Sequence, residues 1–142
     1  MARGCNEGEA TERIMLVRFR VGKTILCLMS VCAPQAGSAM VNKEVFYEAL
    51  GQVLKGVNEK EALFLCGDFH GHGEGEADGY EGVHGCHGFG RRNLESELLL
   101  EFAEASDLVV TNTWFTKKEK QMVHYESRVN RSMHYIWLER WT

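Results

Sequence analysis

A Gly-Asp pair at the end of a short apolar run holds the residue of this chain best suited to chemistry. Residues 62–66, Ala-Leu-Phe-Leu-Cys, lead directly into Gly67 and Asp68. A short apolar run predicts a buried strand, and ligands of open α/β sheets bind beyond the carboxyl ends of the strands. A carboxylate that leaves a buried strand is costly unless it is paired or holds a metal. Asp68 is therefore our first candidate for a catalytic or metal-binding group, and the alternative is a loop aspartate that caps the next turn.

Side chains that bind zinc gather in the glycine-rich stretch that begins at this pair. Residues 67–90 contain nine of the 15 glycines, which predicts a long irregular loop. The candidate zinc ligands in it are His70, His72, His84, Cys86 and His87. Their spacing differs from the close Cys-Cys and His-His pairs of structural zinc sites. A zinc-stabilised loop is thus an alternative to ordinary loop histidines. The glycines lack the Gly-Lys-Ser/Thr ending of a phosphate loop, and no Gly-x-Ser-x-Gly nucleophile motif occurs.

The pattern of apolar and turn residues predicts the elements that position these groups. The expected strands cover residues 14–20, 24–32, 62–69, 108–114, 123–127 and 134–139. The expected helices cover residues 42–56, with Asn42 as N-cap, and 94–106, with Asn93 as N-cap. Residues 1–12 are expected to be disordered. Alternating strands and helices predict one α/β layered domain over residues 13–142.

Composition narrows the classes of function. The chain has 142 residues, of which 44% are hydrophobic and 25% charged, as in ordinary globular domains. No apolar run approaches the ~20 residues of a membrane helix, so we expect no membrane partner. The net charge of −4 gives no global basic surface for nucleic acid. Any such binding would be local, unless the basic residues are simply solvated. These are Arg91, Arg92, Lys117, Lys118, Lys120, Arg128 and Arg131.

The cysteines indicate a reducing compartment. The chain has five of them, an odd number, and Cys27 and Cys66 lie in apolar, strand-like runs. Thiols in such runs usually act as small hydrophobic side chains. We therefore expect an intracellular location, nuclear or cytoplasmic.

A series of short motifs runs through the chain in a fixed order. The motifs are Gly67-Asp68-Phe69, residues 78–85, 88–90, Arg92-Asn93, and residues 99–103, 107–110, 112–115 and 125–127. In this order they resemble the endonuclease/exonuclease/phosphatase superfamily. The resemblance is closer still to the endonuclease domain of non-LTR retrotransposons and to host-encoded relatives of the craniofacial development protein 2 type. It covers about residues 13–140.

This resemblance implies a fold, a chemistry and partners. The fold is a two-sheet α/β sandwich, of which this chain would be a central part without the N- and C-terminal strands. The enzymes of the family are Mg²⁺-dependent phosphodiesterases that nick DNA, so Mg²⁺ is the implied cofactor and DNA the implied partner. A metal and its carboxylates neutralise the phosphate charge there, and an Asp–His pair activates the attacking water.

The motifs carry site roles over to individual residues. Asp68 matches the family's aspartate that orients the water and would be the metal ligand. His70 stands where that motif has Asn, Cys32 where the family has a tyrosine, and His134 where it has an aspartate. The positions implied for substrate binding are Arg92, Asn93 and Asn112.

Most of these positions depart from the family pattern. His124 also stands where the family has Thr, and the family's metal-binding Glu and closing Ser-Asp-His have no counterpart within residues 1–142. Loss of a general base costs about 10²–10⁴-fold in rate. We therefore expect a degenerate, catalytically impaired endonuclease domain, or a DNA- or protein-binding relic that uses loop 84–93. Unpaired strand edges and apolar surface would favour self-association.

Overall fold

The structure is a computed structural model that describes residues 8–71, 76–88, 90–116, 118, 125–126, 131–132 and 135–140. Its strands are β1 (Gly8–Ala10), β2 (Ile14–Val21), β3 (Thr24–Cys32), β4 (Ala62–Asp68), β5 (Val109–Val110), β6 (Tyr125–Glu126), β7 (Arg131–Ser132) and β8 (Tyr135–Glu139). Its helices are α1 (Met40–Lys55), α2 (Leu94–Ala105) and the 3₁₀ turn η1 (Thr111–Thr113). None of the helices in these ranges is long and apolar enough to cross a membrane.

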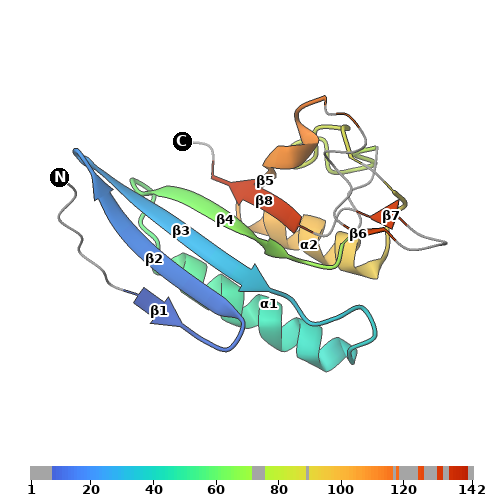
Figure 1. The fold of residues 1–142 in the computed structure, drawn as a ribbon, viewed down its shortest axis with the longest axis horizontal. Helices are drawn as coiled ribbons and strands as arrows, with labels where there is room; N and C mark the ends of the chain where they lie inside the picture. Colours follow the sequence, from blue (N-terminus) through green and yellow to red (C-terminus); the bar gives the residue numbers. More distant parts are fainter. Residues whose placement is uncertain are drawn as a thin grey trace.

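Six strands form one mixed sheet in the order β1-β2-β3-β4-β8-β5, and both helices pack against one side of it (Figure 1). Strands β3 and β4 are parallel and are joined through α1, while the other pairs are antiparallel. Strands β6 and β7 form a separate two-stranded sheet. The parallel pair matters most for function, because it places the carboxyl ends of β3 and β4 at one edge.

The core lies between the sheet and the two helices. Alternate residues of β2, β3 and β4, such as Leu16, Met29 and Leu65, are fully buried against helix side chains that include Phe46 and Leu99. Each fully buried aliphatic side chain of this kind contributes about 1.5–3 kcal/mol. The alternation of buried and more exposed residues along these strands therefore reflects one covered face of the sheet.

Both predicted helices are present, and their N-terminal caps differ. Asn93 caps α2 as predicted: its Oδ1 accepts from the backbone N–H of Ser96, and the Ser96 hydroxyl accepts from the N–H of Asn93. The prediction of Asn42 as the cap of α1 was wrong. Helix α1 begins two residues earlier, at Met40, with Ala39 at the N-cap position and no side-chain cap.

The chain ends differ most from the sequence predictions. Residues 8–10, expected to be disordered, form β1, which pairs with residues 15–17 of β2. An edge strand can form through backbone hydrogen bonds alone, so apolar patterning gives little warning of it. The strand predicted over 108–114 is only two residues long, because the chain turns into η1.

Gly67 allows the close pairing of β3 with β4. A Cβ atom at this position would overlap the carbonyl oxygen of Val31 and approach the Val31 Cγ2 to 2.9 Å. We predict that Gly67→Ala lowers the free energy of unfolding by about 3–5 kcal/mol, because the two backbones must separate. Urea unfolding measures this loss. Gly37→Ala is the matched control, since a Cβ there meets no atom within 4 Å. A Gly67→Ala variant as stable as the control would contradict the assignment.

Cys27 is the most protected of the described cysteines. Burial and the neighbouring Glu61 carboxylate, which accepts a hydrogen bond from the Cys27 thiol, raise the pKa of Cys27 from 9.0 to about 11. We predict that Cys27 resists alkylation at pH 8 in the folded chain and reacts once urea unfolds it, because the thiolate is the nucleophile. Exposed Cys86 is the internal control.

The raised pKa of Cys27 also predicts that the stability contributed by its protonated thiol is lost as pH rises from 9 to about 11.

Candidate functional site

The carboxyl ends of β3 and β4 bring two predicted site residues side by side. Cys32 and Asp68 are direct partners in the parallel register, and the Ala33 N–H donates to the Asp68 carbonyl at 2.9 Å. The Asp68 side chain is 22% exposed, so solvent reaches the carboxylate. The sequence prediction that Asp68 emerges at a strand end is confirmed.

His70 folds back onto Asp68. The backbone N–H of His70 donates to Asp68 Oδ1 at 3.0 Å, and His70 Nδ1 lies 3.4 Å from the same oxygen. His70 adopts a left-handed backbone with φ of 54°. A carboxylate that accepts the N–H two residues on is the turn-capping role that was the alternative reading of Asp68. The geometry thus gives Asp68 a structural task while leaving part of its carboxylate open to solvent.

Asn93 ties the His70 turn to helix α2. Its Nδ2 donates to the His70 carbonyl at 3.2 Å and to Glu95 Oε2 at 2.9 Å, while its Oδ1 caps the helix. One side chain therefore serves both the helix and the loop after Asp68. The sequence predicted the helix cap and a substrate-binding role, and it gave no sign of the link to His70.

A buried ion pair between Lys43 and Glu95 supports Asn93, because Glu95 also accepts a hydrogen bond from the Asn93 side chain. Lys43 Nζ lies 2.5 Å from Glu95 Oε1 and donates to the Ala36 carbonyl at 2.9 Å, and both charged side chains are less than a tenth exposed. Burial and the Glu95 carboxylate raise the pKa of Tyr47 beside them. Sequence reasoning missed this pair, because a lysine and a glutamate near helix starts usually read as solvated residues.

Arg92 organises the loop before α2. Its guanidinium donates to the carbonyls of Ala77 and Asp78 at 3.0 and 3.3 Å and lies 5.4 Å from the centre of the Tyr80 ring. These contacts hold loop residues 77–80 against the start of α2. Arg91 beside it is exposed.

Two other predicted site residues lie apart from this group. Asn112 is buried on η1, which follows β5, and β8 separates β5 from β4 in the sheet. His134 lies outside the described residues, as do His124 and His72.

The histidine-rich loop does not gather a zinc site within the described residues. His84 is buried, and its Nδ1 accepts the backbone N–H of Cys86 at 3.1 Å. The His87 N–H donates to the Thr113 carbonyl. In the described part of the chain, no three His, Cys, Asp or Glu side chains are grouped to hold a metal ion.

The donors that the structure describes around Asp68 do not fit Mg²⁺. This cation prefers several oxygen ligands in an octahedral arrangement. Asp68 offers a carboxylate, but Cys32 and His70, two of the residues beside it, offer sulfur and nitrogen. Glu95 is committed to Lys43 and Asn93. The described residues therefore lack the oxygen set that the sequence resemblance implied.

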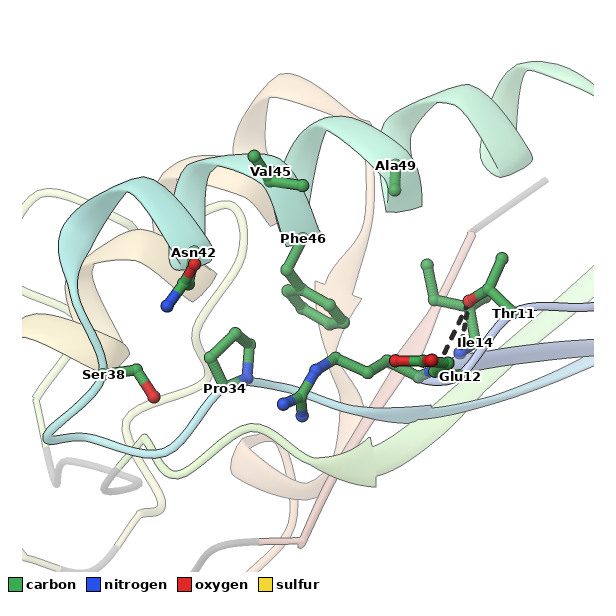
Figure 2. Close-up of a pocket in the computed structure, with 10 residues that line it drawn as sticks. Thr11, Glu12, Ile14, Pro34, Ser38, Asn42, Val45, Phe46 and Ala49 are labelled. Atoms are coloured by element: carbon green, nitrogen blue, oxygen red, sulfur yellow. Dashed lines mark hydrogen bonds between the residues drawn. The ribbon is translucent and has the colours of Figure 1, made fainter.

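A cavity of about 470 Å³ lies on a different part of the chain (Figure 2). Its wall combines the turn before β2, the segment between β3 and α1, and helix α1, and the rings of Phe46 and Pro34 lie close to each other in it. Asp68 and His70 are not among its lining residues. The size suits a small ligand, yet the cavity and the Asp68 group are separate features.

Comparisons with known proteins place the fold. No protein-family model matches the chain. Craniofacial development protein 2 of Bos taurus is 29% identical over 124 residues, which are 87% of this chain and 20% of that protein. The same protein of Tragulus javanicus is 27% identical over 124 residues, 87% of this chain and 21% of that one. The chain thus spans about a fifth of the length of these curated relatives.

Two solved structures share the architecture. The endonuclease domain of TRAS1, a telomere-specific non-LTR retrotransposon, aligns with a TM-score of 0.63 at 12% identity, over 94% of this chain and 54% of that one. An endonuclease/exonuclease/phosphatase family protein from Leptotrichia buccalis aligns with a TM-score of 0.52 at 12% identity, over 90% and 42%. The predicted resemblance is confirmed, and the chain has the endonuclease/exonuclease/phosphatase fold.

The double role of Asn93 can be separated by substitution. We predict that Asn93→Ala lowers the free energy of unfolding by about 1–2 kcal/mol, because the helix loses its cap. Asn93→Ser keeps a capping oxygen and loses the donors to His70 and Glu95, so it should restore part of that stability. In both variants, the amide of His70 should exchange its hydrogen faster than in the parent chain. Unchanged exchange in Asn93→Ser would contradict the link to the loop.

The buried ion pair gives a second prediction. Lys43→Met should destabilise the chain by about 3–5 kcal/mol, because it leaves the Glu95 carboxylate buried without its cation. The double variant Lys43→Met/Glu95→Gln should be more stable than Lys43→Met alone, since its amide is neutral. Thermal and urea unfolding measure both. A double variant less stable than Lys43→Met would show that the charge of Glu95 does not cause the loss of stability.

Proposed function

We propose that this chain is a catalytically impaired part of a DNA endonuclease domain, with the scaffold kept and the metal-dependent chemistry lost. The observation that carries the proposal is the immediate surroundings of Asp68. The carboxylate lies at the strand end where an α/β enzyme binds its ligand, with Cys32 and the imidazole of His70 beside it.

Phosphodiester hydrolysis needs more than this set provides. The transition state concentrates negative charge on the phosphate, which metal ions and cationic groups must neutralise. Arg92 is one of the positions implied for substrate binding, but its guanidinium donates to the carbonyls of Ala77 and Asp78. Asn93 is committed to helix α2 and His70. Each of these residues has a structural task that explains its presence without catalysis.

The fold similarity supports the nuclease relationship. The solved TRAS1 domain is described as an endonuclease of a telomere-specific retrotransposon. For this chain, DNA as a partner is part of the proposal, as are the dependence of any residual activity on Mg²⁺ and an intracellular location. The free thiols of Cys27, Cys32, Cys66 and Cys86 agree with a reducing compartment.

The deciding experiment is nicking of supercoiled plasmid by the purified chain in Mg²⁺, beside an Asp68→Ala variant. We predict no nicking above that of the Asp68→Ala control. The chain should also show no Mg²⁺-dependent rise in melting temperature, because the described oxygen donors do not form a site. Nicking that disappears in Asp68→Ala would overturn the proposal and would make His70 and Cys32 candidate catalysts.

A binding role without hydrolysis is the second candidate, and exposed Arg91 favours it. This arginine lies just before α2, and it is more exposed than Arg92, whose guanidinium is half-buried in the loop. If the chain binds DNA, Arg91→Ala should weaken binding and reduce its salt dependence. Equal binding by Arg91→Ala and the parent chain would remove this loop from the interface.

A further inference from the structure

The cavity beside helix α1 has an apolar interior on the side of the sheet that the helices cover. Its apolar wall includes Ile14 of β2, Pro34, and Phe46 and Ala49 of α1. Ile14 and Phe46 are only 3% and 4% exposed and form its floor, whereas Val45 at its rim is 61% exposed. This side of the sheet already has its helical layer, and the cavity stays open between that layer and the strands. A ligand there would displace water from apolar surface.

Polar side chains stand at both ends of this apolar interior. Figure 2 shows the rings of Phe46 and Pro34 in the middle of the cavity. The polar side chains are Ser38 and Asn42 at one end and Thr11 and Glu12 at the other. Ligand pockets commonly combine an apolar wall with a few polar groups that orient the ligand. The arrangement therefore suits a molecule with an apolar body and a polar group at its end.

Arg13 is a charged group held in a fixed position at this cavity. It is one of the lining residues, and its Nη1 donates to the carbonyls of Cys32 and Ala33 at 3.2 and 3.4 Å. Ala33 directly precedes Pro34, so these hydrogen bonds keep the guanidinium beside the apolar wall. The backbone is held as well, because the Thr11 hydroxyl accepts the N–H of Arg13 at 3.3 Å. A cation that is already in place loses little freedom when it binds an anion.

The Arg13 guanidinium keeps donors for a ligand. A guanidinium presents several N–H donors in a planar fork, and the bonds to the two carbonyls use Nη1 alone. Among the residues that the structure describes, no carboxylate forms an ion pair with Arg13. The planar fork matches a carboxylate in geometry as well as in charge. Charge complementarity therefore favours an organic acid.

We propose that this cavity binds a small amphipathic carboxylate, with an aromatic or branched aliphatic body. The carboxylate pairs with Arg13, and the body lies against Phe46 and Pro34 and covers the exposed Val45. The volume of about 470 Å³ falls within the range of about 300–1,000 Å³ for small-molecule sites. This inference goes beyond the proposed function and does not depend on it, since Asp68 is not among the lining residues.

Glu12 gives the proposal a test of sign. Its exposed side chain also lines the cavity, next to Arg13 in the sequence. A negative charge there opposes a bound carboxylate, although solvent screens the effect. Glu12→Gln should therefore tighten binding about two- to threefold, while Arg13→Gln weakens it about tenfold. A general disturbance of the cavity would weaken binding in both variants.

Titration of the full chain with hydrocinnamate at about pH 7, followed through the backbone amide chemical shifts, tests the proposal. We expect a dissociation constant of about 0.1–1 mM, with shifts at the cavity residues Ile14, Ser38 and Phe46. Hydrocinnamide has the same body without the charge and should bind about tenfold more weakly. Shifts only elsewhere in the chain, no saturation by about 10 mM, or equal binding of the acid and the amide overturns the proposal.

Arg20→Gln is the matched control for Arg13→Gln, since Arg20 is an exposed arginine of β2 outside the cavity lining. It should leave the affinity for hydrocinnamate unchanged. Ala49→Leu provides a second variant in case Arg13→Gln does not fold. Leucine is a good helix former, and its side chain would occupy part of the cavity, so binding should be lost with Arg13 intact. Binding as tight as that of the parent chain in Arg13→Gln or in Ala49→Leu overturns the proposal.

Discussion

The parallel contact between β3 and β4 is the constraint on which the rest of the structure depends. The backbones approach so closely at Gly67 that the carbonyl of Val31 occupies the space of a side chain. This approach sets the register that brings Cys32 beside Asp68. It also requires a long crossover between the two strands, which α1 supplies, and so fixes which side of the sheet is covered.

From that edge, a continuous set of polar contacts leads into the helices. Asp68 holds the backbone of His70, Asn93 holds the His70 carbonyl, and Glu95 and Lys43 hold Asn93 from within the protein. The group resembles the surroundings of a catalytic carboxylate in its position at the sheet edge. The contacts within the group, however, are those of a turn and a helix start that stabilise each other.

The sequence predicted the elements with strong apolar periodicity and missed the contacts that depend on the third dimension. Strands β2, β3 and β4 and helix α2 were predicted within about two residues, because each buries one regular face. Strand β1 escaped prediction, since edge pairing leaves no apolar pattern. Asp68 at a strand end could be inferred from the apolar run before it. The Lys43–Glu95 pair could not, because 52 residues separate its members and burial alone distinguishes them from surface charges.

The capping role of Asn93 bears on what a sequence motif can reveal. One amide caps α2 and holds the His70 carbonyl, so folding requires this residue whether or not it also serves a reaction. Gly67 is comparable, since the packing of β3 against β4 leaves no room for a side chain there. Motif residues of this type therefore indicate the fold of a chain, and their presence alone is no evidence of activity.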